Sequence, residues 1–120
     1  MRALLIEDQA LMAMLLEQEL HALGYHHVDL ADDDRTALAS ARVHCPDLIV
    51  VDDWLVRRPT IDAIRATWSD RPIPVLHFDT TLDPSWHGPH DIPLPIAFSR
   101  DQLCNAIERV RYGHGVTEGS

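Results

Sequence analysis

Three continuous apolar runs, each ended by an acid, constrain the fold of this chain more than any other feature. They read RALLIED (2–8), DLIVVDD (47–53) and IPVLHFD (73–79). A strand that is apolar at successive positions is buried on both faces, as happens inside a parallel sheet covered by helices. Stretches with helical spacing separate the runs, so the chain is expected to alternate strands and helices.

The remaining segments complete this alternation. The expected strands are 2–8, 26–31, 47–51, 73–78 and 95–98, and the expected helices are 9–23, 34–43, 59–68 and 99–111. The first helix has its apolar residues at Leu11, Met14, Leu15 and Leu20, and Ser99 with Gln102 forms the start of a capping box for the last. The pattern predicts one α/β domain, a doubly wound five-stranded parallel sheet with right-handed crossovers.

Composition narrows the classes of partner and the compartment. A net charge of −9 in 120 residues argues against nucleic acid and against anionic membranes, which are bound through clustered Lys and Arg. The chain has two cysteines far apart, no signal-peptide pattern at its start and no stretch of about 20 apolar residues. These features predict a cytoplasmic protein of a single domain.

Acidic residues follow the predicted central strands. Ligands of open parallel sheets bind beyond the carboxyl ends of the strands, where the strand order reverses. This rule brings Glu7, Asp8, Asp52, Asp53 and the segment 79–81 to one rim. Carboxylates held together repel one another, and a hard divalent ion such as Mg²⁺ relieves this repulsion while also binding phosphate oxygens. The rim therefore predicts chemistry with a metal and a phosphoryl group.

Four motifs together resemble the receiver domain of two-component response regulators over nearly the whole chain. They are LLIED (4–8), PDLIVVD (46–52), IPVLHF (73–78) and AFSRDQLCNAI (97–107). The resemblance implies a flavodoxin-like strand order of 2-1-3-4-5, a receiver domain over residues 1–112 and a flexible tail over 113–120. It also implies a signalling module and not an enzyme, with self-phosphorylation and self-dephosphorylation at most.

The resemblance assigns roles to particular residues. Asp52 occupies the place of the aspartate that accepts a phosphoryl group from a phosphohistidine. Glu7, Asp8 and Asp52, with the backbone carbonyl of Trp54, occupy the places of the Mg²⁺ ligands. The implied partner in this phosphorelay is a sensor histidine kinase or a histidine phosphotransfer protein, and a homodimer is compatible with the same family.

Departures from the family pattern predict an atypical, degenerate receiver with impaired or altered switching. Asp79 stands where the family has Thr or Ser, with Thr80 next to it. Ile96 and Ala97 stand where the family has Lys and Pro, and the chain contains no lysine at all. The segment between Asp79 and Ile96 is shorter than in the family, so the family's fourth helix is expected to be shortened or replaced by a loop. Arg57 or Arg58 is a candidate for the missing cation, and Thr80 for the hydroxyl.

Alternative interpretations remain open at the level of sequence. A receiver fold without phosphoryl chemistry would serve as a protein-interaction or dimerisation module, and a small Mg²⁺-dependent phosphohydrolase also fits an acid rim. Asp53 fits a solvated loop residue, and Asp79 either a metal ligand or a turn cap. His77, His87 and His90 raise the question of zinc, although structural zinc sites usually need four ligands at firm spacing.

Overall fold

The structure, a computed structural model, describes residues 1–52, 55–78, 90–94 and 98–111. Its elements in chain order are β1 (Arg2–Ile6), α1 (Ala10–Ala22), β2 (His27–Ala31), α2 (Asp34–Val43), β3 (Leu48–Asp52), α3 (Arg58–Thr67), β4 (Val75–Phe78), β5 (Asp91–Pro93) and α4 (Arg100–Arg111). The expected fourth helix of the family and the expected tail over 113–120 fall outside the described residues. No described helix is long and apolar enough to cross a membrane.

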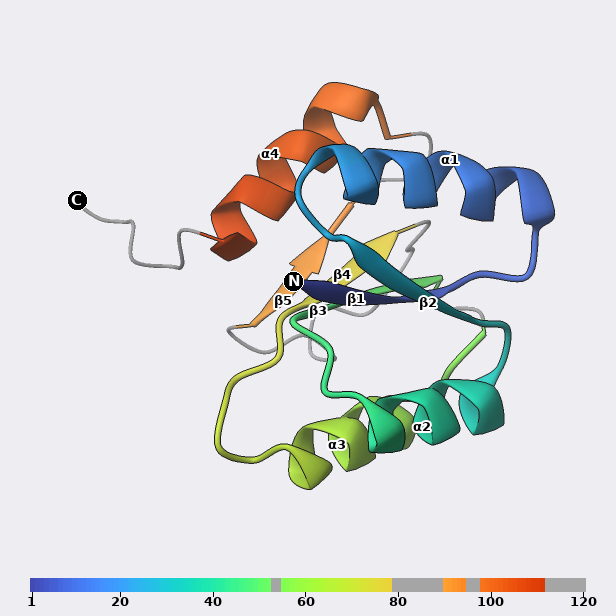
Figure 1. Cartoon of the computed structure of the whole chain (residues 1–120), viewed down its shortest axis with the longest axis vertical. Coiled ribbons are helices and arrows are strands. Elements are labelled where there is room, and N and C mark those ends of the chain that lie inside the picture. The colour runs from blue at the N-terminus through green and yellow to red at the C-terminus, as the bar shows by residue number, and fades with distance from the viewer. Residues whose placement is uncertain (53–54, 79–89, 95–97, 112–120) are drawn as a thin grey trace.

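The sheet is parallel throughout and has the order β2-β1-β3-β4-β5. Helices α1 and α4 cover one face, and α2 and α3 cover the other (Figure 1). The predicted doubly wound, flavodoxin-like α/β fold is therefore confirmed. In the sheet, β2 lies on one side of β1 and β3 lies on the other, so the strand order reverses between β1 and β3. The crevice expected for ligands therefore lies at the carboxyl ends of these two strands.

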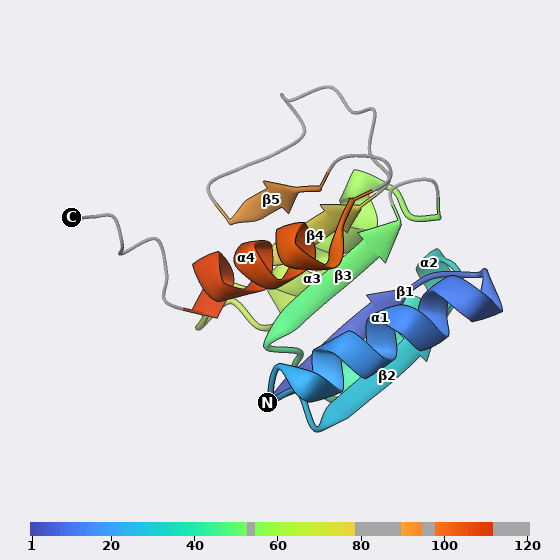
Figure 2. The ribbon, with the colours of Figure 1, turned by 90° about the horizontal axis from the view of Figure 1, so that it is seen from above.

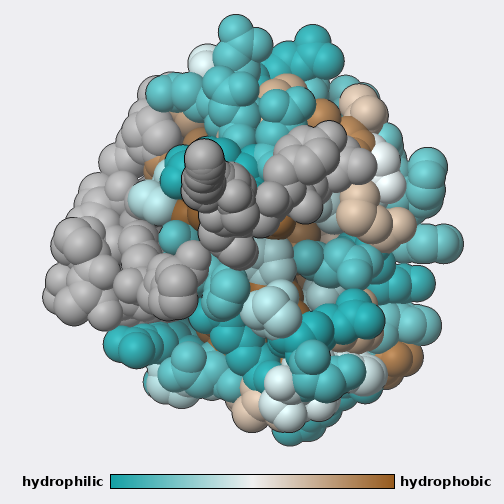
Figure 3. Space-filling model, turned by 90° about the vertical axis from the view of Figure 1, so that its left-hand side faces the viewer, coloured by the Kyte–Doolittle hydropathy of each residue, from teal (hydrophilic) through white to brown (hydrophobic). Residues whose placement is uncertain are grey.

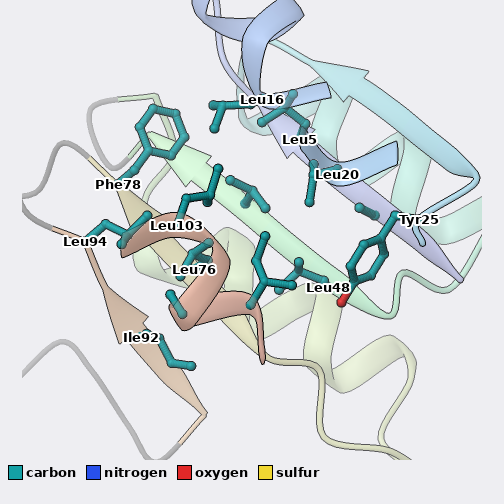
Figure 4. Packing of buried hydrophobic residues seen from close by; sticks show 14 of the residues in the cluster. Leu5, Leu16, Leu20, Tyr25, Leu48, Leu76, Phe78, Ile92, Leu94 and Leu103 are labelled. Carbon is teal, nitrogen blue, oxygen red and sulfur yellow. The ribbon is translucent and has the colours of Figure 1, made fainter. Parts of the chain in front are cut away.

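Alternating side chains of the central strands fill two separate cores. Ala3 and Leu5 of β1 face the layer of α1 and α4, while Leu4 and Ile6 face the layer of α2 and α3. All five residues of β3 are buried, as the uninterrupted apolar run predicts. Figure 4 shows Leu16 of α1 and Leu103 of α4 in the first of these cores. Both central strands are thus fixed from two sides, which holds the residues at their ends in place.

The buried face of α1 differs from the apolar spacing seen in the sequence. Ala13, Leu16 and Leu20 are buried, whereas Leu11, Met14 and Leu15 are 76%, 55% and 59% exposed. The first half of this helix is apolar almost all the way round, so its periodicity does not specify one face. The small side chain of Ala13 allows close approach to the sheet. The result is a helix with an apolar outer surface.

The fifth strand also differs from the sequence prediction, which placed it at 95–98. It is β5, and its residues pair with β4 as Val75 with Asp91, Leu76 with Ile92 and His77 with Pro93. Phe98 follows after the strand, and residues 95–97 lie outside the described part. The Asp91 carboxylate accepts a hydrogen bond from the buried His77 ring at 2.8 Å, which favours this register. Pro93 is tolerated because β5 is an edge strand.

Side-chain caps begin the two helices that follow polar turns. Asp33 accepts the backbone N–H of Thr36 at 2.8 Å and forms a capping box at the start of α2. At α4, Ser99 Oγ accepts the backbone N–H of Gln102 at 3.1 Å, and Gln102 Oε1 accepts that of Ser99 at 2.7 Å. The capping box predicted from the sequence is confirmed. Where described residues are visible, the face in Figure 3 is largely hydrophilic.

Candidate functional site

Two buried carboxylates lie next to each other at the point where the strand order reverses. Glu7 directly follows β1, and Asp52 is the last residue of β3, which pairs with β1 up to Ile6 and Val51. The two residues are only 7% and 8% exposed. The structure therefore brings together the first and third strand ends of the predicted acid rim.

Glu7 is held by the backbone that turns into α1. Its Oε1 accepts the N–H of Asp8 at 2.8 Å and that of Gln9 at 3.2 Å. Burial nevertheless raises the pKa of Glu7 above its usual value, opposed by these two hydrogen bonds and assisted by the negative charge of Asp52 and a side-chain contact with Asp8. Burial, together with the neighbouring charge of Asp52, thus favours the protonated form of Glu7.

The donors at this rim are oxygen atoms, which suit a hard divalent cation better than a soft one. Asp8 is exposed at the mouth of the site, and its carboxyl interacts with that of Glu7. Within the described residues no three His, Cys, Asp or Glu side chains form a ready ligand group. An ion that takes one or two carboxylates and completes its shell with water does not require one. The buried pair Glu7 and Asp52 offers carboxylates of this kind.

Several predicted site residues cannot be placed. Asp53, Trp54, Asp79, Thr80 and His87 lie outside the described residues. His77 is described, and its Nε2 binds Asp91 inside the core. The described residues therefore offer no support for the zinc interpretation.

A cavity of about 320 Å³ adjoins the acid pair on the side of α1 and α4. Its polar lining includes Glu7, Asp52, Glu19 and Arg100. Leu16, Phe78 and Phe98 contribute to its apolar wall, with the two phenylalanine rings packed edge to face at 6.1 Å between centroids. The cavity has the size and the mixed lining of small ligand pockets. It connects the carboxylates of the sheet with an arginine of the last helix.

Local sequence patterns did not predict the residues that line this cavity from the helices. Arg100 Nε donates to Glu19 Oε1 at 2.8 Å, and the two residues are 81 positions apart in the chain. Arg57 and Arg58, the cations considered from the sequence, lie against Asp34 at 3.7 Å and Asp62 at 3.8 Å. The first pair joins the residue before α3 to the start of α2, and the second lies within α3. Arg100 is the arginine that the structure places at the cavity.

Two curated bacterial regulators match part of this chain. The transcriptional regulatory protein PdtaR of Mycobacterium tuberculosis is 39% identical over 75 residues, 62% of this chain and 37% of PdtaR. The virulence transcriptional regulatory protein PhoP of Salmonella typhimurium is 40% identical over 78 residues, 63% of this chain and 34% of PhoP. The chain thus spans little more than a third of the length of these relatives. No protein-family model matches it.

Solved structures resemble the whole fold. The receiver domain of sensor histidine kinase PA1611 from Pseudomonas aeruginosa, described with a magnesium ion in its active site cleft, has a TM-score of 0.76 and 26% identity, covering 93% of this chain and 98% of that one. The Vibrio cholerae chemotaxis protein CheY4 has a TM-score of 0.75 and 23% identity, covering 91% and 97%. A response regulator receiver protein from Sinorhizobium medicae has a TM-score of 0.77 and 20% identity, covering 93% and 94%.

The strand order and the acid pair at its reversal point define an α/β receiver fold. The matches to PdtaR and PhoP lie in their receiver regions, so in fold and in part of its sequence the chain is similar to the receiver domains of two-component response regulators. The chain contains no lysine, which the resemblance would place at the end of the fifth strand.

Proposed function

We propose that this domain accepts a phosphoryl group at Asp52 from the phosphohistidine of a sensor histidine kinase or a histidine phosphotransfer protein. In this transfer an oxygen of Asp52 bonds to phosphorus while the bond from phosphorus to the imidazole nitrogen breaks. The electron pair of the broken bond stays on the imidazole. The observation that supports the proposal best is that the Asp52 carboxylate lies beside the buried carboxyl group of Glu7, where the strand order reverses.

The proposed metal ion is Mg²⁺, held by Glu7, Asp8, Asp52 and the backbone carbonyl of Trp54. When bound, it supplies positive charge to the oxygens of the transferring phosphoryl group. The oxygen donors and the proximity of the Glu7 and Asp52 carboxylates support this assignment, as does the magnesium ion of the similar PA1611 receiver domain. In this scheme Glu7 and Asp8 orient the ion, and Asp52 keeps one oxygen for phosphorus.

The proposed switching is impaired or altered. Phosphorylation adds about −1.5 to −2 charges at neutral pH. The Glu7 carboxyl, which contacts Asp8, already lies close to Asp52, and the chain has no lysine to balance the added charge. Asp79, at the position of the usual hydroxyl, adds a further negative charge to the chain there, with Thr80 as the nearest hydroxyl. We expect an acyl phosphate that forms slowly or hydrolyses quickly, without any separate enzymatic activity.

Labelling by a small phosphodonor with Mg²⁺ tests the proposal. Wild type should incorporate phosphate substoichiometrically or transiently, and Asp52→Asn should incorporate none. Asp62→Asn removes an exposed carboxylate of α3 and serves as the matched control, since it should label like wild type. Labelling that survives in Asp52→Asn would place the acceptor elsewhere. Stable, stoichiometric labelling of wild type would contradict the impaired switching.

A second candidate is an interaction module that works without phosphorylation. Three of the six large apolar side chains that are most exposed in the described residues, Leu11, Met14 and Leu15, lie on α1 beside the site. Such a surface suits protein contact in either case, including a homodimer. Binding of a kinase or of a second copy that is equally tight for wild type and Asp52→Asn, with no labelling, would favour this candidate.

We assign the domain to residues 1–112 and its place of action to the cytoplasm.

A further inference from the structure

We propose that Arg100 replaces the missing lysine by leaving Glu19 and binding the phosphoryl group on Asp52. This inference rests on the proposed phosphorylation of Asp52 and adds the residue that compensates its charge. Arg100 is the first residue of α4, and it lines the same cavity as Glu7 and Asp52. Figure 2 shows the start of α4 and the arrowhead of β3 at the same end of the sheet.

The other described arginines with ion pairs are engaged away from this cavity. Arg2 pairs with Asp29, Arg65 with Asp91 and Arg71 with Asp47. Arg57 and Arg58 pair with Asp34 and Asp62. The described lining of the cavity contains three carboxylates, those of Glu7, Glu19 and Asp52, and a single cationic side chain, that of Arg100. The added charge of a phosphoryl group would fall on the side of the site where this arginine lies.

The attachment of Arg100 permits an exchange of partners. Its backbone is fixed by the capping box of Ser99 and Gln102, so the start of the side chain has a defined position. Its guanidinium is held by one ion pair with Glu19, at 2.8 Å, and the side chain is 71% exposed. Exposed ion pairs of this kind contribute little to stability, whereas a guanidinium binds a phosphoryl group through two parallel hydrogen bonds. A dianionic group in the cavity therefore competes well against the single carboxylate of Glu19.

The exchange would also change a contact between two helices. Glu19 belongs to α1 and Arg100 to α4, and both residues line the cavity. When Arg100 turns to the phosphoryl group, Glu19 loses this partner and the negative charge of α1 becomes uncompensated there. The phosphorylated state would thus be distinguished at the surface formed by α1 and α4.

Binding of beryllium fluoride with Mg²⁺, a mimic of an aspartyl phosphate, tests this role. The readout is the concentration of beryllium fluoride that gives half of the change in melting temperature. Arg100→Gln should raise this concentration about tenfold, because a charged hydrogen-bond partner of the anion is lost. Glu19→Gln should lower it several-fold, since it frees Arg100, and Arg100→Lys should restore part of the affinity. Arg109→Gln removes the same charge from an exposed position of the same helix and should leave it unchanged.

The outcomes separate this inference from the proposed function. If Arg100→Gln and Arg109→Gln both bind like wild type, Arg100 does not contact the anion and the inference is overturned while phosphorylation at Asp52 stands. If beryllium fluoride does not shift the melting temperature of wild type, or shifts that of Asp52→Asn equally, the proposed function fails. The inference then fails with it. A tighter response in Glu19→Gln that disappears in the double variant with Arg100→Gln supports the partner exchange directly.

Discussion

The His77 ring and the Asp91 carboxylate form a hydrogen bond of 2.8 Å in the interior, joining β4 to the edge strand β5. The side chains are 0% and 3% exposed. Arg65 approaches the same carboxylate from α3 at 3.3 Å and donates to the backbone carbonyl of Ile73 at 2.9 Å. Three elements thus meet at one carboxylate, which ties the edge strand β5 to β4 and to α3.

Replacing Asp91 should destabilise the domain strongly. Asp91→Ala leaves His77 and Arg65 without their shared acceptor in a buried position, so we expect a loss of about 3 to 5 kcal/mol in the free energy of unfolding. Chemical denaturation monitored by circular dichroism measures it. Asp62→Ala, which removes an exposed carboxylate paired with Arg58, should change the value by no more than about 0.5 kcal/mol. Equal effects of the two substitutions would show that the buried group does not hold β5.

The cap of α2 should give a pH-dependent contribution to stability. Hydrogen bonds from Thr36 lower the pKa of Asp33 below its ordinary value of 3.8, so the folded state favours the ionised carboxylate. Its contribution is fully present above pH 3.8 and is lost as the pH falls through the lower pKa of the folded state. The difference in melting temperature between wild type and Asp33→Ala should therefore be constant near neutral pH and shrink in acid. A difference that stays constant down to the lowest pH would contradict the assignment.

Local patterns predict some parts of this molecule and not others. The runs that end at Glu7 and Asp52 could be predicted to converge, because uninterrupted apolar strands define a parallel sheet and its topology aligns their ends. The buried face of α1 could not, since apolar residues surround the first half of that helix. The position of β5 depends on the contact of Asp91 with His77, and the Glu19–Arg100 pair joins residues 81 positions apart. Such long-range polar contacts leave no periodic signal in the sequence.

Mg²⁺ should stabilise the domain through the acid rim. At a concentration ten times its Kd, an ion that binds only the folded state adds about 1.4 kcal/mol to the free energy of unfolding. We expect this gain in wild type, measured by denaturation with and without Mg²⁺, because the ion relieves the repulsion around Glu7. Asp52→Asn should lose most of the gain. The matched control Asp62→Asn should retain it, and a gain that is the same in all three proteins would indicate nonspecific binding.

The apolar outer surface of α1 should affect partner binding and not folding. Leu11 is 76% exposed and Met14 is 55% exposed, so replacing both with Gln should change the free energy of unfolding by no more than about 0.5 kcal/mol per site. Labelling of Asp52 by a small phosphodonor should be unchanged, whereas phosphotransfer from a histidine kinase should fall at least tenfold, as at interface positions that exclude water. Leu30→Gln removes a similarly exposed leucine, 54% exposed, from the edge strand β2 and is the control. A kinase that phosphorylates the α1 variant and the Leu30 variant equally would exclude this surface as the docking site.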